Sequence, residues 1–412
     1  MILKTTEHFP SQAAMSVLLA ILFIRIMEWL FFHYQLISGN SFILVVFVFL
    51  LMSAFSLSRL RQVKMSAFQL FLFLSILALP VISVMLQSAL LSDRYDYLGR
   101  SSLQYAAFIC AYGVTWFLVG VSVSNFTPHY SVKIPFLLLL ISFFFVVQSS
   151  NEGRVDYAYL REVTGVDSYS HLWITEGLII FSFLSYAGLK SLWLRVLVFS
   201  LSVASLFLAG SRSGLLFFIV TIVFYELFFS NGIKAWKKVV FMLVMSPVLL
   251  AISYGYLSLI NPLYIEHFLL IFDRDSSGSW QERTYALNIG LNLLHRQILF
   301  GDPTLLASEL GNVGWYIHNA LSGWQFFGLP FFLVSCVAYI LAFAKMVQFR
   351  NIGKETPFFR FKSLMLLYTA LNISLTVFVG SSWFWFTLGL WLAAAHNNRQ
   401  KPVVVSKLSF GS

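Results

Sequence analysis

Long apolar runs recur from one end of this sequence to the other, and they constrain its fold more than any other feature. A helix that crosses a bilayer needs about 20 mostly apolar residues, and twelve stretches come close to that length. They cover residues 12–32, 36–57, 67–91, 104–123, 133–149, 174–189, 193–209, 214–230, 239–260, 326–346, 364–380 and 383–395. Only 11% of the residues are charged, where a soluble domain has about a quarter. We therefore predict an all-α polytopic membrane helix bundle of about twelve transmembrane helices, with residues 1–412 forming one integral-membrane domain.

The division of lysine and arginine between the expected loops gives the orientation of this bundle. If the N-terminus is inside and the spans alternate, every lysine falls inside and the inside segments hold most of the cations, as the positive-inside rule requires. Both termini are then inside, and the net charge of +10 belongs to the cytoplasmic side rather than to a surface that binds nucleic acid. The outside cations are all arginines: Arg94, Arg100, Arg154, Arg161, Arg212, Arg274, Arg283 and Arg296. Either membrane insertion excludes basic residues generally, or arginines are kept because a guanidinium holds phosphate through two parallel hydrogen bonds.

Two outside loops, residues 150–173 and 261–325, are much longer than the others. Long segments between the helices of a compact bundle are usually functional. The larger loop lies between the ninth and tenth expected spans and contains a helical pattern of its own. We therefore expect the active side of the protein to be its outside face.

A short glycine- and serine-rich turn joins the seventh and eighth expected spans at that face. Its sequence is Gly210-Ser211-Arg212-Ser213-Gly214. Such a turn leaves the first N–H groups of the next helix without helical partners, and the Ser211 or Ser213 hydroxyl can cap them. A helix N-terminus beside an arginine is suited to binding an anion. The alternative is an ordinary turn whose arginine extends toward water.

A helix is expected within the large loop, starting at Trp280. Ser279, just before it, and Glu282, three residues after Ser279, match a capping box. A polar stripe at helical spacing then follows: Thr284, Asn288, Asn292 and His295. The remaining surface is largely apolar, so we expect an amphipathic helix at the membrane interface. Arg283 lies in its first turn, where the helix dipole also favours an anion; the alternative is a surface arginine paired with a nearby acid.

A histidine and an asparagine, His318 and Asn319, precede the long apolar run that starts near Phe326. Histidine is the usual general base near neutral pH, although a lone histidine is more often structural. The other outside histidines are His171, His267 and His295. No zinc-type spacing is present, and both cysteines fall inside apolar runs, so we expect no metal, no cofactor and no disulfide.

Three stretches taken in order resemble a known family. They are the SRSG turn, the segment SWQERTYALNIGLNLLHRQILFGD and the segment HNALSGWQFFGLPFFLV. Together, over roughly residues 200–345, they are similar to the O-antigen polymerase (Wzy) and O-antigen ligase (WaaL) superfamily of bacterial inner-membrane glycosyltransferases. The resemblance implies transfer of a glycan from undecaprenyl pyrophosphate to a sugar hydroxyl at the periplasmic face, without metal or cofactor.

The same resemblance implies a role for each candidate residue. His318 would be the catalytic base that deprotonates the acceptor hydroxyl, and Arg212 and Arg283 would hold the pyrophosphate as it leaves. The remaining expected contacts to the pyrophosphate or glycan are Ser211, Ser213, Asn319, Arg154 and Arg161. The expected partners are the undecaprenyl-pyrophosphate-linked oligosaccharide, membrane lipid, a chain-length regulator and a flippase.

The polymerase branch is favoured over the ligase branch by one further match. Arg154 and Gly165 are spaced as in an R-x10-G element of polymerase outer loops, and Arg161 adds a second cation. A second copy of this element is missing from the large loop, so transfer to lipid A-core by a ligase stays the alternative. A lipid-linked oligosaccharide flippase or other transporter is the third possibility, although its key polar groups would be expected near the midplane.

Overall fold

The computed structural model describes residues 15–23, 65–90, 96–97, 100–124, 132–151, 154–155, 171–229, 240, 278–296, 298–310, 317–351, 356–376 and 381–393. Within these ranges the regular secondary structure is helical apart from two antiparallel strand pairs, in which each strand has two residues. Strands β1 (Asp96–Tyr97) and β2 (Arg100–Ser101) form one pair, and β3 (Ser150–Asn151) and β4 (Arg154–Val155) form the other. The prediction of an all-α chain is thereby confirmed.

The helices follow the apolar runs closely. Their bounds are α3 Ala67–Leu90, α4 Ser102–Val123, α5 Lys133–Gln148, α7 His171–Gly188, α8 Leu192–Leu208, α9 Arg212–Phe228, α12 Gly278–Leu293, η1 Leu294–Arg296, α13 Leu305–Leu310, α14 Ser322–Asn351, α15 Pro357–Leu375 and α16 Ser382–Leu392. Three helical stretches, Ala67–Leu90, Ala106–Val123 and Ser322–Arg350, are long and apolar enough to cross a membrane. The expected span 36–57 and nearly all of 239–260 lie outside the described residues.

The two helices nearest the C-terminus differ from the expected spans. Helix α15 begins at Pro357 rather than at residue 364, because the Thr356 side chain accepts a hydrogen bond from the Phe359 N–H (3.1 Å) and Pro357 occupies the first helical position. Helix α16 has only 11 residues, about 16 Å at 1.5 Å per residue. It is therefore too short to cross the bilayer alone, in contrast to the span expected at 383–395.

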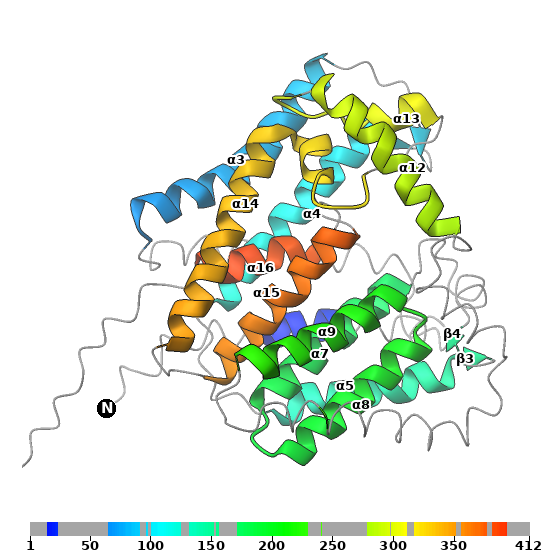
Figure 1. Cartoon of the computed structure of the whole chain (residues 1–412), viewed down its shortest axis with the longest axis vertical. Helices are drawn as coiled ribbons and strands as arrows, with labels where there is room; N and C mark the ends of the chain where they lie inside the picture. Colours follow the sequence, from blue (N-terminus) through cyan, green and yellow to red (C-terminus); the bar gives the residue numbers. More distant parts are fainter. Residues whose placement is uncertain are drawn as a thin grey trace, which may run out of the picture.

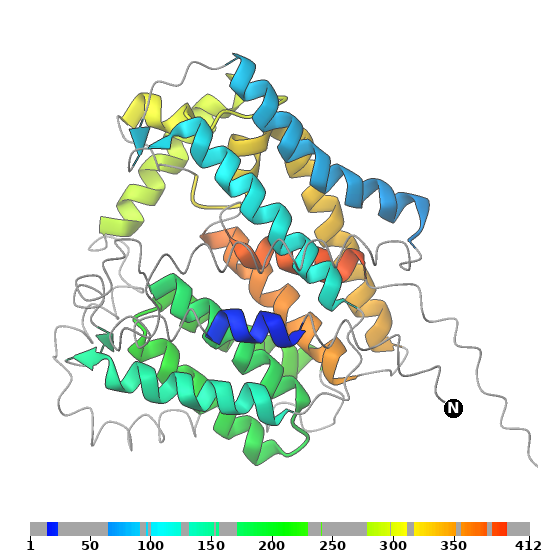
Figure 2. The same ribbon diagram turned by 180° about the vertical axis from the view of Figure 1, so that it is seen from behind.

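The helices fall into two groups joined by α15 and α16 (Figure 1). Helices α5, α7, α8 and α9 contact one another, and α3 contacts both α4 and α14. Helix α15 packs on α7 and α9, while α16 packs along α4, which crosses it in the view from behind (Figure 2). Helices α15 and α16 also contact each other, so the two groups are connected by direct helix packing.

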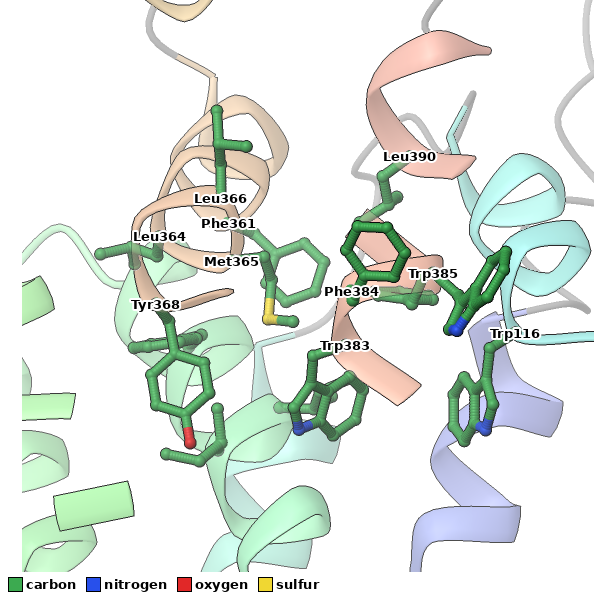
Figure 3. Close-up of a cluster of buried hydrophobic side chains, with 14 of the residues drawn as sticks. Trp116, Phe361, Leu364, Met365, Leu366, Tyr368, Trp383, Phe384, Trp385 and Leu390 are labelled. Carbon is green, nitrogen blue, oxygen red and sulfur yellow. The ribbon is translucent and has the colours of Figure 1, made fainter. Parts of the chain in front are cut away.

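The close crossing of α4 and α16 depends on glycines. A Cβ at Gly389 would lie 2.1 Å from the Phe117 carbonyl oxygen, and one at Gly120 would lie 2.1 Å from that of Phe386. Large aromatic side chains fill the space on either side, among them Trp116 and Trp383, whose rings meet edge to face at 5.5 Å (Figure 3). Glycine at the contact and aromatic rings around it therefore hold α16 buried on all its faces.

Helix α14 is interrupted near its start, and protein groups satisfy the backbone atoms that the interruption frees. Gly328 has φ 84° and ψ 167°, and Pro330 has no N–H for the carbonyl of Phe326. That carbonyl instead accepts from Gln87 of α3 (2.7 Å), and the next carbonyl, of Phe327, accepts from Ser83 of α3 (2.9 Å). In an apolar membrane interior such replacement partners are required. The break in α14 is thus held in place by hydrogen bonds from α3.

Replacing Gly328 with alanine is expected to destabilise the protein. Its φ and ψ lie in a region that is essentially restricted to glycine, which alone costs on the order of 1–3 kcal/mol, and an added Cβ would lie 2.0 Å from the Leu299 carbonyl oxygen. The melting temperature of the purified protein in detergent should fall clearly. A melting temperature equal to that of the wild type would contradict this explanation of the break.

Candidate functional site

The turn between α8 and α9 ends one helix and starts the next. The Gly210 N–H donates to the Phe207 carbonyl (2.9 Å) and the Ser211 N–H donates to that of Leu206 (3.2 Å), which is the Schellman pattern. Gly210 has the positive φ of 69° that this pattern requires. The predicted tight turn is therefore present, and Arg212 is the first residue of α9.

The two serines of this turn differ in exposure. Ser211 is 2% exposed and makes no capping hydrogen bond with its side chain, so the expected serine cap is wrong for this residue. Its hydroxyl instead lies beside Gly214, together with Thr175 of α7, 2.4 Å and 2.7 Å from where a Cβ of Gly214 would be. Arg212 and Ser213 are both half-buried. Arg212 and Ser213 therefore stay the better candidates for contacting an anion at the start of α9.

An acid next to this turn was missed by the analysis of apolar runs. Glu176 follows Thr175 in α7, and one of its carboxylate oxygens accepts a short hydrogen bond of 2.5 Å from the hydroxyl of Ser382, at the start of α16. A charged residue inside the expected span 174–189 is the signal that marks it. The starts of α7, α9 and α16 thus meet in one region, which holds both an arginine and a carboxylate.

Helix α12 presents Arg283 on the side that faces the rest of the protein. The helix begins at Gly278, two residues before the expected Trp280, and its predicted polar stripe is exposed. Ala286, Gly290 and Leu293 are buried and follow Arg283 at intervals of three or four residues, so they share its face. Arg283 itself is half-buried. Arg283 therefore lies at the start of the face through which α12 packs against the protein.

The segment before α14 packs against that face. Ile317 contacts Gly290, where a Cβ would lie 2.5 Å from the Ile317 Cγ1 atom, and the Ile317 N–H donates to the side-chain oxygen of Gln325 (2.9 Å). Residue 317 is therefore held between α12 and α14. This places the next residue, His318, beside α12 and beside Arg283.

Asn319 has a structural task in this segment. Its side-chain oxygen accepts a hydrogen bond from the Leu321 N–H (2.8 Å), and its carbonyl accepts one from the Ser322 hydroxyl (2.9 Å). The first bond closes a turn within the segment, and the second joins the segment to the first residue of α14. The side-chain oxygen of Asn319 is thus used by the backbone.

His318 is a neutral imidazole under physiological conditions. Partial burial, and next the positive charge of Arg283, lower its pKa from 6.5 to about 4. Arg283, on α12, is near enough to His318 to act on it electrostatically. Together with the packing of Ile317 on Gly290, this makes His318 and Arg283 the centre of the candidate site.

Removing the charge of Arg283 is expected to raise the pKa of His318 from about 4 toward 6.5. The imidazole's pKa can be followed as the pH dependence of its modification by diethylpyrocarbonate, compared with His318→Gln to identify its signal. In the wild type, modification should persist down to about pH 4, and in Arg283→Gln it should fall off at higher pH. An unchanged profile would mean that Arg283 does not act on His318.

The sign of the stability effect follows from the same shift. Because the folded-state pKa lies below the ordinary value of 6.5, the unfolded chain binds a proton first as the pH falls. Stability contributed by His318 is therefore present above about pH 6.5 and is lost progressively between pH 6.5 and about 4. His318→Gln should show a weaker loss of melting temperature over this range.

Two of the expected contacts come from the loop at residues 150–173. Arg154 lies in strand β4, and β4 contacts α8, whereas Arg161 lies outside the described residues. Over the described ranges, no group of three or more His, Cys, Asp or Glu side chains could hold a metal ion, and both cysteines are free thiols.

The arrangement around His318 is suited to one kind of chemistry. A neutral imidazole can take a proton from a hydroxyl, and a guanidinium beside it can stabilise an anion that forms at the same time. In comparisons with known proteins, no family model and no curated protein sequence matches the chain. The function is therefore argued from this geometry together with the sequence motifs.

Proposed function

We propose that this protein is a polymerase of O-antigen or another surface polysaccharide. It transfers an undecaprenyl-pyrophosphate-linked glycan to a sugar hydroxyl of another lipid-linked repeat unit. The observation that carries the proposal is the pairing of His318 with Arg283, in which an imidazole with a pKa of about 4 lies next to a half-buried arginine. A base beside an anion-binding group is what displacement of a pyrophosphate by a hydroxyl needs.

In the proposed reaction the acceptor hydroxyl oxygen attacks the anomeric carbon of the donor glycan, and His318 takes the hydroxyl proton. The bond between the anomeric carbon and the pyrophosphate oxygen breaks, and its electron pair leaves with the undecaprenyl pyrophosphate. Arg283 stabilises the charge that develops on this leaving group, and Arg212 at the start of α9 is its second expected contact. The reaction balances without metal or cofactor.

Donor binding would also adjust the base. An imidazole with a pKa near 4 is a weak proton acceptor. Burial is the larger cause of this low pKa, and the charge of Arg283 is the second. A pyrophosphate dianion against Arg283 would offset the second cause. The proton affinity of His318 therefore rises when the leaving group is in place, which links base catalysis to a bound donor.

The proposed setting is the bacterial inner membrane, with both termini inside and the loops 150–173 and 261–325 in the periplasm. The concentration of lysine on the inside supports this orientation. Helix α3 supports a lipid-facing surface, because Met85 and Leu90 are 65% and 70% exposed on an apolar helix. About twelve apolar segments form the bundle, and α16 is a buried short one among them.

The interrupted helix α14 is an observation that favours a transporter, since discontinuous helices often bind transported substrates. In transporters the freed backbone groups contact the substrate. Here the carbonyls of Phe326 and Phe327 accept hydrogen bonds from α3, and the Leu329 N–H donates to the Ile298 carbonyl (2.8 Å). The backbone groups freed at the break are bound by the protein itself rather than left for a substrate, and this favours the enzyme over the transporter.

Deletion of the gene in its native strain tests the proposal. With the wild-type gene restored, the lipopolysaccharide should form a ladder on a gel, and without it only core carrying a single repeat should remain. Bare core with polymer accumulating on the lipid carrier would assign the ligase function instead. A ladder that persists in the deletion strain would overturn both.

A further inference from the structure

Gln325 connects the segment that carries His318 to the loop that follows α12. It is 1% exposed. Its side-chain oxygen accepts from the Ile317 N–H (2.9 Å), and its carbonyl accepts from the Asp302 N–H (2.6 Å). The carbonyl is available because the break at Gly328 directs the Leu329 N–H to Ile298 instead. Gln325 of α14 therefore holds both Ile317, which precedes His318, and Asp302, in the loop that follows α12 and η1.

Gln87 of α3 binds the same two segments, the loop after α12 and the start of α14. It is 2% exposed, and its side-chain Nε2 group donates to the carbonyls of Phe300 and Phe326, both at 2.7 Å. Phe300 belongs to the loop after α12, and Phe326 follows Gln325 in α14. A single amide thus ties three segments that are far apart in sequence.

We propose that Gln87 and Gln325 are positioning residues that hold His318 beside Arg283. The link runs from Gln87 to the backbone of Phe300 and Phe326, from there to Gln325, and from the Gln325 side chain to Ile317, which precedes His318. The proposal rests on the proposed function only in assigning His318 as the base. The positioning itself is independent of that role.

The two glutamines hold the backbone through different atoms. The Gln325 side-chain oxygen accepts from the Ile317 N–H, whereas the Gln87 Nε2 group donates to two carbonyls. Either glutamine replaced by an apolar residue would leave buried backbone groups unpaired, which is costly in an apolar interior. A carboxylate at residue 87 would face two carbonyl oxygens, so Gln87→Glu should be as harmful as Gln87→Met.

The test measures kcat and KM with a lipid-linked repeat unit, and the pH dependence of His318 modification by diethylpyrocarbonate without substrate. In Gln325→Met and Gln87→Met, kcat should fall roughly 10- to 100-fold while KM changes little, as expected when a catalytic group is misplaced by about 1 Å. The pKa of His318 should also rise from about 4 toward 6.5, because the imidazole moves away from its buried place beside Arg283. Gln87→Glu, which keeps the size of the side chain but removes its donors, should lower kcat in the same way.

Gln69→Met is the matched control. Gln69 also lies in α3, but its side chain accepts only from the Ser66 N–H (3.1 Å) in an exposed capping box at the far end of the helix. This variant should keep both the wild-type kcat and the wild-type modification profile. If Gln87→Met does not fold, Ser83→Ala removes the single adjacent bond to Phe327 and should shift the same two quantities less.

The outcomes separate this proposal from the proposed function. A fall in kcat with an unchanged modification profile would overturn the positioning role and leave only a general loss of structure. Wild-type values of both quantities in the two methionine variants would overturn it as well. If the wild-type protein makes no polymer but the modification profile still shifts in the variants, the positioning stands and the polymerase assignment fails.

Discussion

Replacing His318 with alanine is expected to lower the rate of polymer formation by about 10²–10⁴-fold, the usual contribution of a general base. The variant should still accumulate in the membrane, because His318 is only half-buried and its neighbours Ile317 and Asn319 are held by their own hydrogen bonds. The rate is measured with purified protein and a lipid-linked repeat unit. The amount of folded protein is measured in parallel by size-exclusion chromatography.

His295→Ala provides the control for this variant. His295 lies in η1, the short turn that continues α12, and its side chain is exposed. It should therefore keep nearly wild-type activity. A large loss in His295→Ala, or full activity in His318→Ala, would remove His318 from the proposed mechanism.

Replacing Arg283 with lysine is expected to lower kcat by roughly 10²–10³-fold, comparable to the loss of one preorganised donor to a developing anion. Lysine keeps the positive charge but cannot form two parallel hydrogen bonds to a pyrophosphate. The pKa of His318 should accordingly stay well below 6.5 while activity is lost. This combination would separate the binding role of Arg283 from its electrostatic effect on His318.

Arg296→Lys is the matched substitution at an exposed site. Arg296 lies 3.7 Å from Glu309, with both side chains largely exposed, and exposed pairs of this kind contribute little. Its activity should match that of the wild type. Wild-type activity in Arg283→Lys would mean that a point charge is sufficient, which would contradict bidentate binding of the leaving group.

Local sequence patterns predicted much of this fold. The apolar run at 67–91 corresponds to α3, and the run at 133–149 corresponds to α5. The capping box before Trp280 and the glycine of the 210–214 turn placed the ends of α12 and α8 within a few residues. These features depend on contacts between residues close in sequence, which is why they could be recognised without the structure.

The candidate site was predicted only in part, because it depends on contacts between distant residues. That Arg283 and His318 belong to one site was predicted, but the contact of Ile317 with Gly290 that joins them could not be. Ser211 and Asn319 were expected to contact substrate; the first is buried, and the side-chain oxygen of the second accepts from the Leu321 N–H. The local pattern did not distinguish these structural uses from binding.

The polar residues inside apolar runs were the signal that was missed. Gln87 and Glu176 lie within the expected spans 67–91 and 174–189. The mean hydropathy of each span is high because its other residues are apolar, so it does not reveal the single polar residue. Their partners, the carbonyls of Phe300 and Phe326 and the hydroxyl of Ser382, are more than 200 residues away. A polar side chain in a membrane segment implies a partner, but it does not identify that partner.

The most direct measurement of the central claim is the reaction of the purified protein in liposomes with an undecaprenyl-pyrophosphate-linked repeat unit, in the presence of a metal chelator. Wild-type protein should lengthen the glycan and release one undecaprenyl pyrophosphate for each bond formed, and His318→Ala should do neither at a comparable rate. Lengthening at the wild-type rate by His318→Ala, or none by the folded wild-type protein, would contradict a polymerase that uses His318 as its base.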